Sequence, residues 1–219
     1  EHLFLGLLNL DQHRHELKNA VYKTMGDIAI TLYVHAGTLK NGITYLKVRS
    51  EYLEAWGLEK DDVLHEALLN SYRILPPRIY DFKKMMYTPG YAGEDFLNMD
   101  PYFISDKKKK EGICLSVKGL SNGAVAVLYP GVIKKLVEFM DGGFYVVFSS
   151  VHEALIYSSK LCSLEELENL LRTSNARMTF QKEFLTDKVY YYCKEEDKFI
   201  MLRGSMKMLV TTIRMDEEN

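Results

Sequence analysis

The chain has 219 residues, which is enough for one substantial domain or two small ones. Hydrophobic residues make up 47% of the sequence, so the chain can bury a core and global disorder is disfavoured. The 28 basic and 30 acidic residues give a formal net charge of -2, and this near-balance argues against a dedicated nucleic-acid binder.

The cysteine content argues against a structure held by disulfides or zinc. Cys114, Cys162 and Cys193 are odd in number and far apart in sequence, so we expect free thiols in a reducing compartment. No apolar run approaches the length of a membrane span. We therefore expect a cytoplasmic protein without membrane contact. Because the chain begins at Glu1 in mid-pattern, we also expect that an N-terminal region is absent from it.

The first 87 residues contain apolar patterns of two different periods. Ile28, Ile30 and Leu32 alternate with other residues, which predicts a strand, and Asn41-Gly42 is typical of a hairpin turn. The predicted elements are a helix over 1–20, strands over 26–37 and 43–48, a helix from about Asp61 to Pro76-Pro77, and a short helix around 78–86.

Residues 88–111 break these patterns with several prolines and glycines and with the basic run Lys107–Lys110. This composition predicts a long, mobile surface loop. Such a loop is either functional, as a lid or binding loop, or a tolerated insertion, and we favour the insertion.

Strand and helix patterns return after this segment. Ser163 and Glu166 have the spacing of a capping box, which marks the start of a helix. The predicted elements are strands over 112–119 and 124–130 around a turn at 121–123, a helix over 131–140, strands over 142–150 and 153–157, a helix over 163–175, a hairpin over 188–202, and a last strand within 206–215.

The order strand, turn, strand, helix thus occurs twice. It predicts an α+β fold, in which a mostly antiparallel sheet is built from strand-turn-strand-helix units and the helices pack on one face. We expect a single domain over residues 1–219, with two similar halves at about 1–87 and 112–219 joined by the surface loop 88–111.

Two segments share the letters HEAL and raise the question of a zinc site. They are LHEALLN at 64–70 and VHEALIY at 151–157. A zinc-protease helix needs a second histidine four positions after the first, so that both can bind one ion. Leu69 and Ile156 stand at that position, so neither segment is such a site.

The second segment still holds the candidate site residues of this chain. Ser149, Ser150, His152 and Glu153 follow the end of an apolar strand, and a Ser–His–Glu set can act as a nucleophilic site. The other interpretation is a polar turn whose serine hydroxyls satisfy backbone groups. We favour the turn, because residues close together in one turn rarely form a catalytic pair.

Other known site patterns are absent from the sequence. It has neither of the glycine-rich phosphate loops nor the G-x-S-x-G nucleophile elbow. We therefore expect no cofactor and no metal. Lys107–Lys110 is the one basic cluster, and a solvated loop explains it better than contact with nucleic acid or an acidic partner.

Four stretches in order along the chain carry a family resemblance: GDIAITLYV, WGLEKDDVLHEALLN, GAVAVLYPGVIKKL and FYVVFSSVHEALI. Together they resemble an uncharacterised bacterial family, domain of unknown function 5688, found mainly in anaerobic gut Gram-positive bacteria. Its members usually carry a further N-terminal region and a proline in place of Phe148. The resemblance implies no activity. It matches the family's motif letters at Asp27, Asn122, Gly123, Tyr129, Pro130, Ser149, Ser150, His152 and Glu153.

These observations favour a non-catalytic intracellular binding or regulatory module, whose partner is an unknown protein or small molecule. The alternative is a hydrolase-like enzyme with a site around Ser150, His152 and Glu153. The surroundings of His152 discriminate between the two, because a catalytic histidine needs a nucleophile or a second acid within hydrogen-bonding reach.

Overall fold

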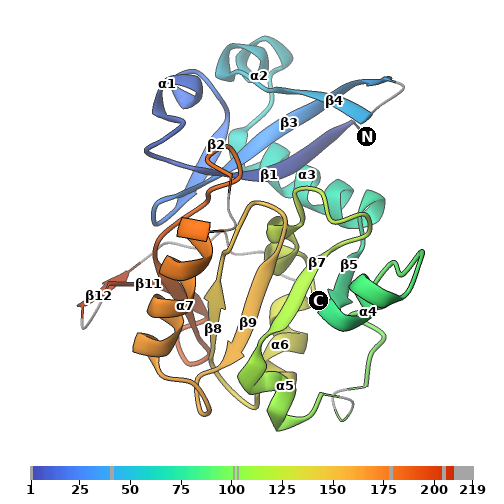
Figure 1. The fold of residues 1–219 in the computed structure, drawn as a ribbon. Helices are drawn as coiled ribbons and strands as arrows, with labels where there is room; N and C mark the ends of the chain where they lie inside the picture. The colour runs from blue at the N-terminus through green and yellow to red at the C-terminus, as the bar shows by residue number, and fades with distance from the viewer. Residues whose placement is uncertain are drawn as a thin grey trace.

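The computed structural model describes residues 2–39, 42–100, 102, 104–177, 180–203 and 206–209. Its strands form a small sheet of four strands and a larger sheet of eight. Figure 1 shows the small sheet above the larger one. Every strand pairing among the described residues is antiparallel. The predicted α+β class with mostly antiparallel sheets is confirmed.

The small sheet is built around one long strand, β3 (Ile28–Leu39). β1 (Leu3–Asn9) pairs along one edge of β3. β2 (Tyr22–Met25) and β4 (Gly42–Lys47) pair with successive parts of the other edge. The strand predicted over 26–37 and its hairpin partner are therefore confirmed, while Asn41 of the predicted turn lies outside the described residues.

The helix predicted over residues 1–20 is wrong. The segment forms β1 and then a single helical turn, α1 (Arg14–Leu17). Leu5 and Leu7 lie two positions apart and are both buried, which is the period of a strand. Further leucines before and after them imitate helical spacing in the sequence, and pairing with β3 decides the outcome.

Two helices follow the small sheet, α2 (Ser50–Trp56) and α3 (Lys60–Ile74). α3 confirms the predicted helix, and it buries Val63, Leu64, Ala67 and Leu68 on one face. The Ser71 hydroxyl on that face accepts a hydrogen bond from the Leu5 backbone N–H at 2.8 Å. α3 is thereby tied to β1.

The larger sheet has the strand order β12-β11-β10-β8-β9-β7-β5-β6. The pairs β8–β9, β10–β11 and β11–β12 are hairpins, whereas the pairings of β5 with β7, β7 with β9 and β8 with β10 join strands that are distant in sequence. The strands are β5 (Pro77–Tyr80), β6 (Glu94–Asp95), β7 (Ile113–Val117), β8 (Phe144–Val147), β9 (Ala154–Ser158), β10 (Val189–Cys193), β11 (Lys198–Arg203) and β12 (Met206–Leu209).

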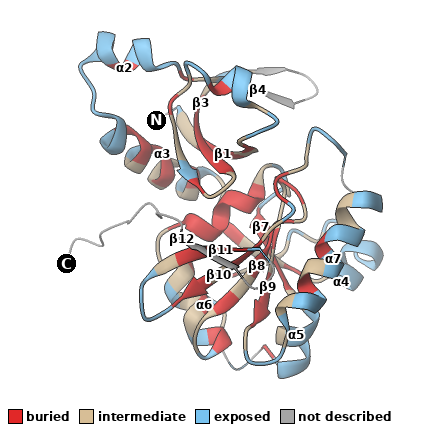
Figure 2. Ribbon diagram, turned by 90° about the vertical axis from the view of Figure 1, so that its left-hand side faces the viewer, coloured by how far each residue is buried: buried red, intermediate tan, exposed pale blue. Residues whose placement is uncertain are grey.

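The larger sheet carries helices on both faces, not on one face as predicted. Phe144 and Val146 of β8 belong to the same buried cluster as α6 (Val132–Met140). Val147 points the other way and packs with α7 (Leu164–Arg177). The central strands are apolar at successive positions, so both of their faces require a cover. Figure 2 shows this buried centre in red.

The return strand predicted over 124–130 is also wrong. Residues Gly123–Leu128 form η2, a turn of 3-10 helix in which every residue is buried. A short apolar run does not by itself distinguish a strand from a buried helical turn. The unit predicted over 112–140 therefore lacks its second strand, and the expected likeness between the two halves does not extend to this element.

Residues 77–111 contain more regular structure than predicted. The short helix expected around 78–86 is β5 followed by α4 (Phe82–Tyr87). The expected loop 88–111 includes β6 and α5 (Asp106–Glu111), and α5 carries the basic run Lys107–Lys110. The Ser105 hydroxyl accepts a hydrogen bond from the Lys108 N–H and caps this helix.

The remaining predictions for the second half are confirmed where the structure describes the chain. α6 and α7 are the predicted helices, β8 and β9 form a hairpin, and β10 and β11 form the closing hairpin. The predicted last strand is present as β12, while residues 210–219 lie outside the described residues.

The two sheets share one hydrophobic core. Its members include Leu5 and Ile30 of the small sheet and Phe144 and Tyr190 of the larger one. The two sheets therefore pack against each other, and the ends of β7, β8 and β10 that face the small sheet lie beneath it (Figure 1). None of the helices in the described part of the chain is long and apolar enough to span a membrane.

Candidate functional site

The four candidate site residues lie in the turn between β8 and β9. The Ser149 hydroxyl donates a hydrogen bond to Oε1 of Glu153 at 2.6 Å. The Ser150 hydroxyl accepts one from the backbone N–H of His152 at 3.0 Å, and Ser150 is buried. Both serines thus make local contacts of the kind that stabilise a polar turn.

The imidazole of His152 has a polar neighbour at each of its nitrogens. Nδ1 accepts a hydrogen bond from the backbone N–H of Asn122 at 3.1 Å. Nε2 lies 3.4 Å from Oε1 of Glu183. Because Nδ1 accepts, the neutral ring carries its proton on Nε2, toward the Glu183 carboxylate. The lone pair that a general base would use is engaged by the Asn122 N–H.

The turn after β7 interlocks with the His152 turn. Asn122 has a left-handed φ of 54°, which asparagine tolerates better than most residues. A Cβ at Gly123 would lie 2.0 Å from the Ser116 Oγ and 2.6 Å from the His152 carbonyl oxygen. The Ser116 hydroxyl donates to that carbonyl at 2.6 Å. Only glycine fits at position 123 without a shift of its neighbours.

The small sheet reaches this site through β4. The Asn122 side-chain amide donates a hydrogen bond to the Tyr45 hydroxyl at 3.1 Å. Tyr45 packs edge-to-face with Tyr33, at 5.2 Å between ring centroids, and with Phe4 at 5.6 Å. We call Tyr45, Asn122, His152 and Glu183 the junction surface, since they form a chain of polar contacts from one sheet to the other.

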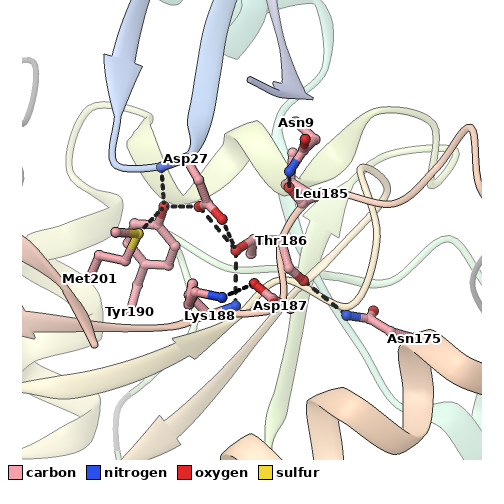
Figure 3. Close-up of polar contacts among 9 residues, drawn as sticks. All are labelled: Asn9, Asp27, Asn175, Leu185, Thr186, Asp187, Lys188, Tyr190 and Met201. Carbon is pink, nitrogen blue, oxygen red and sulfur yellow. Dashed lines mark hydrogen bonds and ion pairs between the residues drawn. The ribbon is translucent and has the colours of Figure 1, made fainter. Parts of the chain in front are cut away.

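A second polar cluster joins the sheets at the β2–β3 turn (Figure 3). The Asp27 carboxylate accepts hydrogen bonds from the Tyr190 hydroxyl at 2.7 Å and from the Thr186 hydroxyl at 2.8 Å. Nearby, the Asn9 amide donates to the Leu185 carbonyl at 2.8 Å, and the Asn175 amide donates to the Thr186 carbonyl at 3.0 Å. This cluster is a structural connection, because its donors and acceptors face one another across the interface.

The segment before β10 contributes to both clusters. The Val151 N–H donates to the Glu183 carbonyl at 3.0 Å, which lays residues 183–186 beside the His152 turn. The sequence indicated neither Glu183 nor Tyr45 as a site residue. Both stand in stretches without a recognisable motif, and Glu183 is about thirty positions from His152. Only the tertiary fold could reveal these contacts.

The residues present offer no metal centre within the described ranges. No group of three His, Cys, Asp or Glu side chains there is arranged to hold an ion. All three cysteines are free, and burial raises the pKa of the Cys114 thiol to about 12, with the charge of Glu153 adding to the effect. Cys114 is therefore a protonated core residue at neutral pH.

The model of the Family of unknown function (DUF5688) matches residues 1–194. The chain belongs to this family. Searches of curated proteins and of solved structures found no match. Membership assigns no activity, but several of the family motif letters named above meet in space: Asn122, Gly123, Ser149, Ser150, His152 and Glu153 lie in two interlocked turns of this DUF5688 protein.

Proposed function

We propose that this DUF5688 protein is a non-catalytic binding module and that its ligand contacts the junction surface. The proposal rests on the contacts that both nitrogens of the His152 ring already make. Nδ1 accepts from the Asn122 N–H at 3.1 Å, and Nε2 faces Glu183 at 3.4 Å. A histidine held in this way cannot take a proton from Ser149 or Ser150 without first breaking a contact of the fold.

The junction surface supports binding because it is accessible. Tyr45 is 40% exposed, and the side chains of His152 and Glu183 are 31% and 37% exposed. In the part of the chain that the structure describes, Oδ1 of Asn122 and Oε2 of Glu183 have no protein partner. A bound ligand can therefore donate hydrogen bonds to these two oxygens.

The charges near the junction surface indicate the chemistry of the ligand. Glu183 faces the Nε2 N–H of His152 at 3.4 Å, and the nearby Lys47 is 2.5 Å from Glu16, so each of these charged groups already has a polar partner. Tyr45 adds an aromatic face with a hydroxyl at its edge. These features favour a neutral ligand with several hydroxyl or amide groups, because such groups donate and accept at once and carry no charge to be matched.

An NMR titration tests the proposal. The probes are neutral oligosaccharides and blocked neutral peptides, added to isotopically labelled protein. We expect shifts of the amide signals around Tyr45, Asn122, His152 and Glu183. Tyr45→Phe removes only the hydroxyl, and Asn122→Gly removes the side chain but keeps the left-handed backbone. Both should weaken binding, whereas Tyr52→Phe, at a similarly exposed tyrosine on α2, should not. Shifts confined to other regions, or no shifts, would contradict the proposal.

A hydrolysis assay tests the enzyme alternative directly. Activated esters and amides should be turned over no faster than in buffer, and His152→Gln should leave the rate unchanged. Hydrolysis that disappears with both His152→Gln and Ser150→Ala would overturn the non-catalytic assignment. The three free cysteines support a reducing compartment such as the cytoplasm as the place of action.

A further inference from the structure

A groove of about 610 Å³ runs along α7 and carries charges of both signs. Its size is within the range of small-ligand sites. One wall is a face of α7, and the other is formed by the segment before β10 and the end of β11. Its lining residues include Glu165, Arg172, Phe184, Lys188 and Arg203, and none of the junction-surface residues. We call it the α7 groove.

The charges of the α7 groove cancel. Arg172, Lys188 and Arg203 are matched by three acidic residues, which are Glu165, Glu168 and Asp187. A polyanion such as a nucleotide or nucleic acid would be attracted by the first set and repelled by the second. A ligand that fits the whole groove therefore carries both a positive and a negative group.

The arginines provide the contacts for the negative group. Arg172 uses Nη2 to donate to Oδ1 of Asn169 at 2.6 Å, which leaves other guanidinium N–H groups of its planar fork to donate. Arg203 pairs with Met206 through its backbone, and its exposed side chain makes no hydrogen bond or ion pair with another described residue. Guanidinium groups bind carboxylates with paired hydrogen bonds, so these two residues suit an acidic side chain or a chain end.

The spacing along α7 sets the distance between the two ligand charges. Glu165 and Arg172 are seven positions apart on one helix, which is about 10 Å along its axis. An extended peptide covers about 3.3 Å per residue, so this distance corresponds to roughly three residues. Phe184 and Ala176, which lies one helical turn beyond Arg172, offer apolar contact to small side chains of the ligand.

We propose that the α7 groove is a second binding site, additional to the junction surface, that takes an extended peptide segment with a basic and an acidic side chain about three residues apart. The basic side chain lies by Glu165, and the acidic one by Arg172 and Arg203. The junction surface and the groove are separate in their lining residues, so this assignment is independent of the one above.

A titration with blocked tetrapeptides tests the assignment on the full chain. The probes are Lys-Ala-Ala-Glu, the neutral Gln-Ala-Ala-Gln, and Lys-Glu-Ala-Ala, in which the charges are adjacent. We expect Lys-Ala-Ala-Glu to shift amide signals of α7 and of residues 184–188, and to bind about tenfold more tightly than the neutral peptide, since charged hydrogen bonds contribute most of the affinity. High salt should weaken this binding.

Matched variants locate the binding in the groove. Arg172→Gln should weaken the binding of Lys-Ala-Ala-Glu about tenfold. Arg177→Gln, an exposed arginine of the same helix outside the groove, should leave it unchanged. Arg203→Gln, at the exposed end of β11, should also weaken the binding of Lys-Ala-Ala-Glu, and it provides a second test if Arg172→Gln folds poorly. Equal affinity for the charged and neutral peptides, equal loss in Arg177→Gln, or absence of shifts along α7 would overturn the assignment.

Discussion

The Tyr190 hydroxyl donates a hydrogen bond to Oδ1 of Asp27 at 2.7 Å, across 163 positions of the chain. Tyr190 is fully buried in the larger sheet, and Asp27 lies in the β2–β3 turn of the small one. The contact therefore joins the two sheets. Burial, and then the negative charge of Asp27, hold the pKa of Tyr190 well above its ordinary value, so the hydroxyl remains a donor.

Tyr190→Phe should lower the free energy of unfolding by about 1.5–3 kcal/mol, the usual range for a hydrogen bond to a charged group. The substitution keeps the ring and its packing, so the lost free energy of unfolding measures the contribution of the hydroxyl. Urea unfolding measures it. Tyr52→Phe, at an exposed tyrosine, is the control and should change stability by less than about 0.5 kcal/mol. A Tyr190→Phe protein as stable as the wild type would show that the contact does not hold the sheets together.

Asp81 should titrate at an unusually low pH. Its carboxylate contacts the Lys108 ammonium and accepts from the N–H groups of Lys84 and Lys83 at the start of α4, and these contacts lower its pKa from 3.8 to about 2. A carboxyl-carbon NMR titration should give a midpoint near 2 for the wild type. Lys108→Met should raise the midpoint toward 3.8, because the Lys108 contact is the largest cause of the shift.

The same shift predicts a pH dependence of stability. The folded pKa is lower than the unfolded one, so the contribution is present above about pH 4 and is lost as the pH falls toward 2. Asp81→Asn keeps a capping side chain but removes the charge. The stability difference between wild type and Asp81→Asn should shrink over this range. A difference that stays constant would mean that the carboxylate does not contribute.

Gly123→Ala should destabilise the protein by about 1–3 kcal/mol, the usual cost of overpacking. The added methyl would lie 2.0 Å from the Ser116 Oγ and 2.6 Å from the His152 carbonyl oxygen. Adding Ser116→Ala should recover only part of the loss, because the backbone contact to His152 remains. Urea unfolding of the three proteins checks this. Full recovery in the double variant would place the whole strain on the Ser116 side chain.

Cys162 should react with a thiol reagent before Cys114 does. Cys114 is 2% exposed, and burial raises its pKa to about 12, whereas Cys162 is partly exposed. Mass spectrometry of labelled peptides at mildly alkaline pH gives the order. Early labelling of Cys114 would contradict its burial.

The burial of Cys114 also predicts a pH dependence of stability. The Cys114 thiol ionises near pH 9 in the unfolded chain and near pH 12 in the folded protein, so the free energy of unfolding should fall as the pH rises between these values. Cys114→Ala should reduce that fall.

Local signals in the sequence predicted the elements that depend on near neighbours. The capping box at the start of α7 is an example: the Glu166 N–H donates to the Ser163 hydroxyl at 3.3 Å, and the Ser163 N–H donates to the Glu166 carboxylate at 3.0 Å. These groups are three residues apart, so the sequence alone brings them together. The same reasoning explains why α3, α6 and the β10–β11 hairpin were predicted correctly.

Elements whose form depends on distant partners were predicted wrongly or not at all. β1 is a strand because it pairs with the edge of β3. η2 is a buried helical turn because the His152 turn packs against Gly123. The junction surface joins distant parts of the chain. The hydrogen bond between Asn122 and Tyr45 alone connects residues that are 77 positions apart. The sequence by itself determined the α+β class and the local ends of its helices. The tertiary structure alone decided the site, because hydrogen bonds between distant segments depend on how the two sheets pack and leave no periodic pattern in the sequence.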